Sequence, residues 1–116
     1  MGIGFGIAYR LAESGANVVI ADLNEEVGNK VAGELNNNGW KASFIKIDVA
    51  NEGDMKRASD FAVETYGGID ILVNNAGIYP IIPVMQMTSA DFEKIVAVNL
   101  KSVFLFTKAV SEVMIK

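Results

Sequence analysis

Short apolar runs alternate with amphipathic stretches along this chain, and this alternation constrains the fold more than any other feature of the sequence. The apolar runs, rich in β-branched residues, cover residues 17–22, 42–48 and 69–74. The stretches around them space their apolar residues as helices do and cover residues 7–14, 24–37, 51–66 and 88–116. Strands that alternate with helices are joined by right-handed crossovers and form a parallel sheet. We therefore expect an α/β fold with a doubly wound parallel sheet.

Residues that begin or end helices mark the boundaries of these elements. Asn24 and Asn51 can each cap a helix start, and Thr88 with Asp91 matches a capping box. Gly15 can end the first helix. Because the chain opens with a helix, we expect the strand that should precede this helix to be missing. The 17–22 strand should then lie between the 42–48 strand and a gap, with the 69–74 strand across that gap.

Composition excludes several classes of function. The 116 residues contain no cysteine and no histidine, which rules out disulfides, thiolate nucleophiles, imidazole bases and the common zinc sites. The net charge of −4 argues against nucleic acid as a partner, because no basic surface could neutralise phosphates. No apolar run approaches the ~20 residues that span a bilayer. The opening residues 1–6 are glycine-rich and do not resemble a signal peptide, so we expect a cytoplasmic protein without membrane contact.

The first residues and Asp22 form a pattern that is typical of nucleotide binding. Gly2, Gly4 and Gly6 stand at the start of a helix, where glycines let a phosphate approach bare backbone N–H groups and the helix dipole favours its charge. Taken alone, they are equally compatible with a flexible terminus. Asp22 ends the next strand, about 20 residues on, where a dinucleotide-binding fold places the carboxylate that accepts hydrogen bonds from an adenosine ribose. The alternative for Asp22 is a residue that caps a turn.

Three further positions could belong to the same site. Asp48-Val49 follows the second strand, and carboxyl ends of parallel strands line the ligand crevice, although Asp48 could simply be a turn residue. Asn74-Asn75-Ala76-Gly77 follows the third run and offers amide donors and acceptors beside small residues, although an ordinary turn has the same composition. Asn99 interrupts an apolar helical face. It needs a structural hydrogen bond, a kink or a role at the site to explain it.

In this order and at these spacings, the motifs together resemble the short-chain dehydrogenase/reductase family of the classical type. The resemblance covers essentially all 116 residues, and Asn-Asn-Ala-Gly is its most specific part. In that family the glycine motif is Thr-Gly-x-x-x-Gly-x-Gly, so Gly2 and Gly4 match its last two glycines. The resemblance implies that residues 1–116 are a partial NAD(P)-binding Rossmann domain. Its first strand and its C-terminal half would be missing.

The resemblance also implies individual roles. Gly2, Ile3 and Gly4 would hold the cofactor phosphates, and Asp22 would bind the ribose hydroxyls of the adenosine. The Asp22 carboxylate would repel a 2′-phosphate, and neither of the next two residues is basic, so we expect NAD as the cofactor. The stretch ahead of Gly2, where such families often place a basic residue, lies outside this sequence.

The remaining site residues follow in the same way. Asp48 and Val49 would contact the adenine. The segment Asn74 to Gly77, with Asn75, Ala76 and Gly77 nearest the cofactor, would flank it and stabilise the sheet. Asn99 would match the asparagine of the catalytic proton relay.

The family's catalytic Ser and Tyr-x-x-x-Lys would lie beyond residue 116, since none of Tyr9, Tyr66 and Tyr79 has a lysine four residues later. We therefore expect a cofactor-binding fragment of an NAD-dependent oxidoreductase, inactive alone, whose complete form transfers hydride between nicotinamide and an alcohol or carbonyl. A non-catalytic nucleotide-binding module and an inactive truncated product are the alternatives.

Two apolar regions suggest partners. The apolar segment 78–84 is the one plausible substrate-side loop and favours an uncharged substrate. An apolar helix face in residues 88–116 predicts a homo-oligomer. This face carries Phe92, Val96, Val103, Phe106 and Val110.

Overall fold

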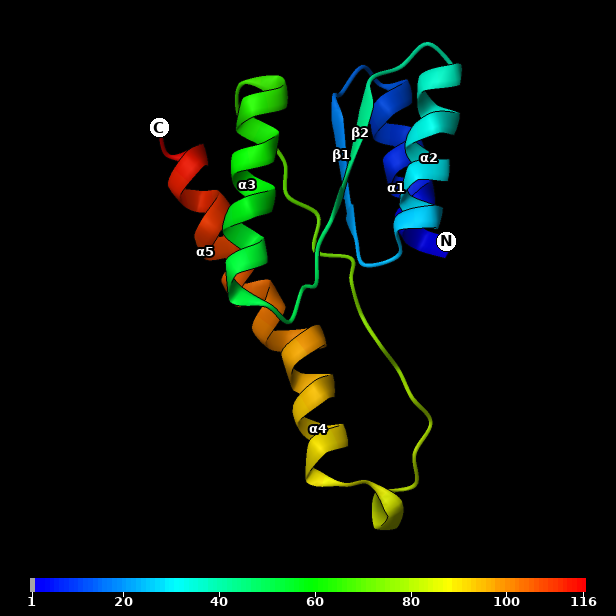
Figure 1. The fold of residues 1–116 in the computed structure, drawn as a ribbon, viewed down its shortest axis with the longest axis vertical. Coiled ribbons are helices and arrows are strands. Elements are labelled where there is room, and N and C mark those ends of the chain that lie inside the picture. Colours follow the sequence, from blue (N-terminus) through cyan, green and yellow to red (C-terminus); the bar gives the residue numbers. More distant parts are fainter. Residues whose placement is uncertain (1) are drawn as a thin grey trace.

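The computed structural model describes residues 2–116 and has an α/β architecture (Figure 1). Its main elements in chain order are α1 (Gly2–Glu13), β1 (Val18–Asp22), α2 (Glu25–Asn37), β2 (Ala42–Lys46), α3 (Glu52–Tyr66), α4 (Ser89–Val96) and α5 (Ser102–Met114). A 3₁₀ turn, η1 (Val84–Gln86), precedes α4, and a π-helical segment, η2 (Ala97–Lys101), joins α4 to α5. Met1, the first residue of the glycine-rich opening, lies outside the described residues.

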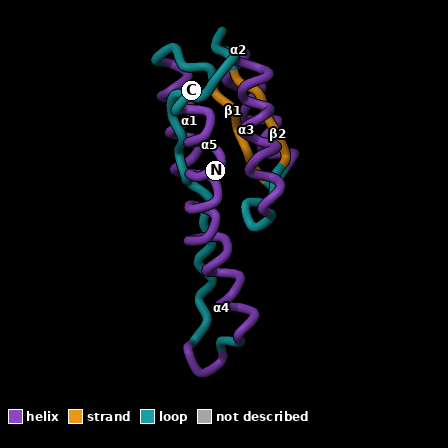
Figure 2. The backbone as a smooth tube through the Cα atoms, turned by 90° about the vertical axis from the view of Figure 1, so that its left-hand side faces the viewer, coloured by secondary structure: helices purple, strands orange, loops and turns teal. Residues whose placement is uncertain are grey.

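The two strands pair in parallel, with Val18 opposite Ala42 and Asp22 opposite Lys46. Helices α1 and α2 cover one face of this sheet, while α3 and α5 lie on the other (Figure 1). The sequence-based prediction of an α/β fold with a parallel sheet is therefore confirmed. The molecule measures 50 × 31 × 20 Å, and α4 extends away from the sheet in both views (Figures 1 and 2).

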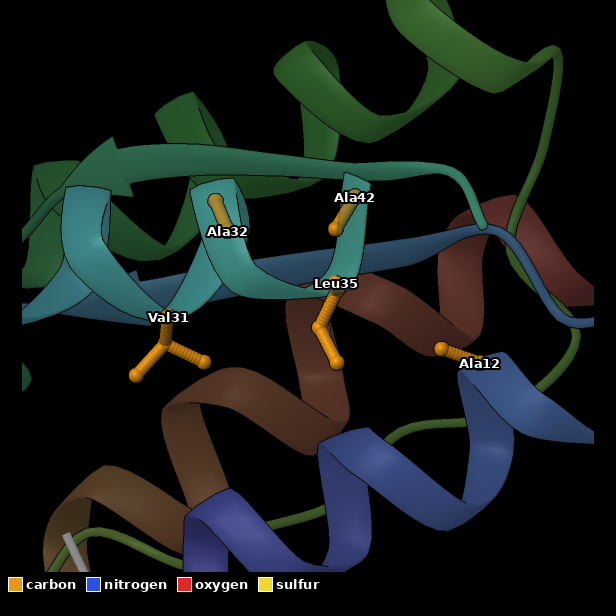
Figure 3. Packing of buried hydrophobic residues seen from close by; sticks show 5 residues of the cluster. All are labelled: Ala12, Val31, Ala32, Leu35 and Ala42. Carbon is orange, nitrogen blue, oxygen red and sulfur yellow. The ribbon is translucent and has the colours of Figure 1, made fainter. Parts of the chain in front are cut away.

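Each face of the sheet has its own apolar core. Between the sheet and helices α1 and α2, Leu35 is fully buried, and Figure 3 shows Leu35 and Ala12 reaching toward each other from α2 and α1. Burying one leucine side chain in this way contributes about 1.5–3 kcal/mol. On the opposite face, Ile45 and Ile47 pack with Ala58 of α3. Helices on both faces therefore fix the sheet and the edge at which its strands end.

Local sequence signals place the starts of α2, α3 and α4 where the sequence predicts them, whereas α1 begins at Gly2, before the predicted residues 7–14. The Asn24 side chain accepts a hydrogen bond from the Val27 N–H at 3.1 Å, and the Asn51 side chain accepts one from Gly53 at 3.0 Å. Helix α4 begins with the predicted capping box, in which the Thr88 hydroxyl and the Asp91 carboxylate each bond the other's backbone N–H. These caps satisfy N–H groups that a helix start leaves without partners.

The prediction of a third strand over residues 69–74 is wrong. This segment runs without strand pairing, and Ile71 and Val73 are 61% and 44% exposed. A strand requires a neighbour to accept and donate its backbone hydrogen bonds, and within residues 2–116 no strand lies beside this segment. Its apolar composition alone therefore does not make it a strand.

The two edges of the sheet differ. On the outer edge of β2, the Asn36 amide donates to the Ala42 carbonyl at 2.9 Å and accepts from the Ala42 N–H at 3.0 Å. The Arg57 guanidinium donates to the Lys46 carbonyl on the same edge. Along the outer edge of β1, no side chain of residues 2–116 bonds the backbone of Val19 or Ala21. Side chains of the described residues thus bond backbone groups on the outer edge of β2 but leave the outer edge of β1 without such bonds.

Candidate cofactor site

The candidate site residues gather at the end of the sheet where the strands finish. Figure 1 shows the start of α1 at the same end as the carboxyl ends of β1 and β2. Asp22 is the last residue of β1, and Asp48 follows β2 by two residues. Asp22 lies beside Ile47, the residue before Asp48, because the Ile47 N–H donates to the Asp22 carbonyl at 3.0 Å. The arrangement matches the crevice at the carboxyl edge where open parallel sheets bind ligands.

The start of α1 is open to an approaching anion. Gly2 has a φ of +41°, which favours glycine, and a side chain built on it would meet nothing within 4 Å. Ile3 is exposed beside it. The first backbone N–H groups of a helix lack partners within the helix and carry its positive dipole end. Gly2 and Ile3 therefore present the backbone chemistry that a phosphate group requires.

Gly4 has a different role from Gly2. A Cβ atom on Gly4 would lie 2.5 Å from Nδ2 of Asn75, so any larger residue would require this amide to shift. The contact brings the Asn75–Gly77 segment against the first turn of α1. Gly4 thus makes room for packing within the site, whereas Gly2 leaves the start of α1 open to an approaching anion.

Asp22 is half-buried, and one of its carboxylate oxygens is engaged. Oδ1 accepts a hydrogen bond from the Asn24 N–H at 2.9 Å, which is the turn-capping contact weighed for it from the sequence. Oδ2 forms no hydrogen bond within the described part of the chain. The turn therefore fixes the direction of the carboxylate and leaves one oxygen to accept a hydrogen bond from a ligand.

Some polar groups of the Asp48-Val49 pair bond within the chain, and others are left for a ligand. Oδ1 of Asp48 accepts from the Ala50 N–H at 2.9 Å. The half-buried Val49 side chain packs on the Ile45–Ile47 cluster, which holds the backbone of this residue in place. Among hydrogen bonds of residues 2–116, none uses the Val49 N–H or Oδ2 of Asp48. What this pair can offer is one acceptor and one backbone donor.

Asn99 holds the segment that follows Gly77. Its amide Nδ2 donates to the Ile78 carbonyl at 2.7 Å, and its Oδ1 accepts from the Ile78 N–H at 2.8 Å. A Cβ atom on Gly77 would lie 3.5 Å from the same Oδ1. Asn99 lies in the π-helical segment η2, a wider turn within the long helical stretch predicted over 88–116, in which α4, η2 and α5 follow one another without a break. Of the explanations weighed for Asn99, a structural hydrogen bond and a helix irregularity occur together.

Contacts connect one group of the predicted residues and leave Asp22 and Asp48 outside this group. The contacts run from Gly4 to Asn75, along the chain to Gly77, and from there to Asn99. Asp22 and Asp48 lie at the strand ends of the same edge, and the half-buried Val49 follows Asp48 there. Within residues 2–116, neither Asp22 nor Asp48 contacts Asn75 or Asn99 directly.

Two features of the site had no signal in the sequence. Lys101 Nζ lies 3.3 Å from Oε1 of Glu52, which joins the π-helical segment to the first residue of α3. An open hollow of about 450 Å³ lies between the segment after Gly77 and α4. Both depend on contacts between segments that are separate in the sequence, which local patterns do not reveal.

A parallel α/β sheet with a glycine-opened helix and carboxylates at its carboxyl edge is a Rossmann-type fold. The family model of the short chain dehydrogenases matches residues 1–116, and the chain belongs to this family of oxidoreductases. None of the helices in the described part of the chain is long and apolar enough to cross a bilayer.

Individual relatives agree with this assignment. The chain is 40% identical over 116 residues to a cyclopentanol dehydrogenase of Comamonas testosteroni, covering 100% of this chain and 46% of the relative. It is 42% identical over 108 residues to a 3beta-hydroxysteroid dehydrogenase of Eggerthella lenta, covering 92% of this chain and 42% of the relative. A dehydrogenase/reductase structure from Sinorhizobium meliloti superposes with a TM-score of 0.94 at 37% identity, covering 97% of this chain and 45% of that one. The chain thus spans about half the length of these relatives.

Proposed function

We propose that these 116 residues bind NAD(H) for an oxidoreductase that transfers hydride between nicotinamide and an alcohol or carbonyl. The observation that carries the proposal is the Asp22 carboxylate. It ends β1 beside the glycine-opened start of α1 and keeps Oδ2 without a partner in the described residues. Residues that suit the adenine, the ribose and the phosphates occur along the same edge.

The choice of NAD over NADP follows from charge. The Asp22 carboxylate can accept hydrogen bonds from ribose hydroxyls, whereas a 2′-phosphate would bring like charges within a few ångströms. At ~4 Å and an effective dielectric of ~20, such a pair of unit charges costs about 4 kcal/mol before screening and rearrangement. Neither Leu23 nor Asn24 supplies a cation to offset this repulsion.

The adenine would bind at the Asp48-Val49 pair. Adenine presents an amino donor next to a ring-nitrogen acceptor. Oδ2 of Asp48 is a matching acceptor, and the Val49 N–H is a matching donor. Because the Val49 side chain is packed in the core, the backbone that bears this N–H is held in place. We assign adenine contact to the carboxylate of Asp48 and the backbone of Val49.

The phosphates would bind at Gly2, Ile3 and Gly4, where the helix start favours negative charge. Asn75, Ala76 and Gly77 would then flank the cofactor on its way to the reactive end. The nicotinamide supplies the hydride chemistry when bound. Asn99 holds the Ile78 backbone there and is the residue of this chain that we assign to the proton relay.

This chain alone should bind cofactor without turnover. Proton transfer that accompanies hydride transfer needs an acid–base group of suitable pKa. The sequence has no histidine, and none of its three tyrosines has a lysine four residues later. Incubation with NAD and a panel of secondary alcohols should give no NADH absorbance above a buffer blank; clear NADH formation would contradict the assignment.

We further propose self-association through the α4–α5 surface. Part of the apolar face predicted there is used within the chain, since Val110 is buried and Phe106 packs on the Ile45–Ile47 cluster. Other large apolar side chains on these helices face solvent; they are Phe92, Leu100, Val103 and Phe104. Light scattering at micromolar concentration should show an oligomer, and a monodisperse monomer would contradict this proposal.

Titration calorimetry with NAD and NADP tests the cofactor assignment. Asp22→Asn keeps an oxygen for the Asn24 N–H but removes the charge, and Asp70→Asn removes an exposed aspartate away from the carboxyl edge. The wild type should prefer NAD, and Asp22→Asn should narrow the preference by about tenfold or more, equivalent to about 1.4 kcal/mol of the repulsion. Asp70→Asn should leave the preference unchanged. Equal wild-type affinity for the two cofactors, or equal effects of both variants, would remove Asp22 from this role.

A further inference from the structure

Three hydrogen bonds fix Asp48 in the turn between β2 and α3. Its N–H donates to Oδ2 of Asp54 at 2.8 Å, and its carbonyl accepts from the Asn51 N–H at 2.9 Å. Its own Oδ1 accepts from the Ala50 N–H at 2.9 Å. The other carboxylate oxygen, Oδ2, has no hydrogen-bond partner in the described residues and is the acceptor assigned to adenine. The turn therefore sets the direction of this oxygen.

Asp54 makes a contact that its position in the helix does not explain. It is the third residue of α3 after the cap Asn51, as Asp91 is the third residue of α4 after the cap Thr88. The Asp91 carboxylate accepts from the backbone N–H of its own cap at 3.0 Å, which completes a capping box. The Asp54 carboxylate instead accepts from Asp48, which lies six residues earlier and outside the helix. Its contact therefore holds the turn rather than the helix start.

Arg57 connects the Asp54 carboxylate to the end of the sheet. Its Nη2 lies 3.5 Å from Oδ1 of Asp54, and the same nitrogen donates to the carbonyl of Lys46, the last residue of β2. The side chains of Asp54 and Arg57 are 21% and 52% exposed. An ion pair this exposed adds little to stability, so its main effect is on geometry. Two side chains of α3 thus link the end of β2 with the turn that follows it.

The N–H of Val49 is a donor that the turn leaves free. Asp48, Ala50, Asn51 and Gly53 all donate their N–H groups within the chain, whereas no hydrogen bond of residues 2–116 uses that of Val49. The Val49 N–H and the Asp48 carbonyl belong to one planar peptide group, and Asn51 holds this carbonyl. Asp54 holds the preceding peptide group through the Asp48 N–H. Both peptide groups that flank Asp48 are therefore fixed.

We infer that Asp54 is a positioning residue for the adenine of the cofactor and acts through Asp48. By holding the Asp48 N–H, it fixes one of the two peptide groups that orient the Asp48 acceptor and the Val49 donor. The inference rests on the proposed function, because this orientation matters to the cofactor only if adenine binds at the turn. Groups that are already oriented need not be ordered when a ligand binds, so recognition of adenine should weaken when Asp54 no longer holds the turn.

Calorimetry with NAD and with nicotinamide hypoxanthine dinucleotide tests the inference on the 116-residue chain. The two ligands differ only in the base. Hypoxanthine presents a carbonyl acceptor and a ring N–H donor where adenine presents an amino donor and a ring-nitrogen acceptor, so it reverses the pattern that Asp48 and Val49 match. The wild type should bind NAD about tenfold more tightly than the hypoxanthine analogue.

Two substitutions of Asp54 and one control isolate its contact. Asp54→Ala leaves the Asp48 N–H without its acceptor and should reduce the preference for NAD by about threefold. Asp54→Asn keeps an oxygen that can accept the same bond and should retain most of the preference. Asp60→Ala removes another aspartate of α3, which pairs with Lys56 at 2.8 Å, and should leave the preference unchanged. A loss of stability alone would weaken the binding of both dinucleotides equally and would not change this ratio.

The ligand-free spectrum and the calorimetry together separate this inference from the proposed function. In Asp54→Ala the amide proton of Asp48 should move upfield, because it loses a charged acceptor; an unmoved proton would overturn the contact itself. An unchanged preference for NAD in Asp54→Ala, or an equal loss in Asp60→Ala, would refute the positioning role and leave the cofactor proposal standing. A wild type that binds neither dinucleotide, or both equally, would refute the proposed binding of adenine at this turn and the inference with it.

Discussion

Replacing Asn99 by alanine tests whether its amide holds the site together. The wild-type amide makes two hydrogen bonds to Ile78, at 2.7 and 2.8 Å, across a sequence separation of 21 residues. Each typical hydrogen bond contributes about 0.5–1.5 kcal/mol net, so losing both should cost about 1–3 kcal/mol. Ile78 is half-buried, and its backbone groups would be left without these partners. The loss in the free energy of unfolding should therefore lie well inside this range and not at its lower limit.

Helix propensity acts in the opposite direction and needs a matched control. Alanine is the better helix former by up to about 0.7 kcal/mol. Asn29 is an exposed asparagine within α2 whose side chain makes no hydrogen bond in residues 2–116. Asn29→Ala therefore reports the propensity gain alone. Asn99→Ala should be less stable than Asn29→Ala by about 1–3 kcal/mol.

Urea unfolding followed by circular dichroism measures this difference. At a slope of about 1–3 kcal/mol per molar urea, a difference of about 2 kcal/mol moves the midpoint by about 1 M. Asn99→Ala should have the lower midpoint. Free energies of unfolding that agree within about 0.5 kcal/mol would refute the assignment, because substitutions at plain surface positions usually fall within that margin.

Three other predictions concern helix packing, helix capping and the pH dependence of a cap. A Cβ atom on Gly28 would overlap the Phe44 ring, whereas one on Gly33 of the same helix would meet nothing within 4 Å. Gly28→Ala should therefore destabilise the fold by about 1–3 kcal/mol, and Gly33→Ala should stabilise it by up to about 1 kcal/mol. If thermal unfolding shows midpoint shifts of the same sign for both variants, the packing of Gly28 on Phe44 is contradicted. Thr88→Ala should cost about 1 kcal/mol as a lost cap. Hydrogen bonds from Thr88 hold the pKa of Asp91 below its ordinary value of 3.8, so the contribution of this carboxylate is present above pH 3.8 and is lost as pH falls through its folded pKa. In Asp91→Asn, the free energy of unfolding should fall less steeply in that acidic range than in the wild type. The same dependence of unfolding free energy on pH in both proteins would exclude the contribution.

The sequence predicts those parts of the fold that depend on near neighbours along the chain. Asn24, Asn51 and the Thr88–Asp91 capping box each bond a backbone group within three residues, so the helix starts follow from local patterns. The parallel pairing of β1 with β2 follows from the helix between them. The carboxyl-edge positions of Asp22 and Asp48 follow from the same argument.

Features that depend on distant partners were not predictable in this way. Residues 69–74 have strand composition but no neighbouring strand in the described residues, and pairing decides strand formation. The partner of Asn99 lies 21 residues away, and the π-helical turn that carries it has no local signature. The sequence also gives no indication that the Val49 side chain packs on the Ile45–Ile47 cluster.

The central claim is that one edge of the sheet binds NAD(H), and mapping amide shifts during an NADH titration tests it most directly. The account predicts saturable shifts at Ile3, Gly4, Val49 and Ala76. The larger hollow of about 520 Å³ beside α3, lined in part by Arg57 and Phe61, should not respond. Shifts confined to that hollow, or no saturable response at the carboxyl edge, would contradict the account.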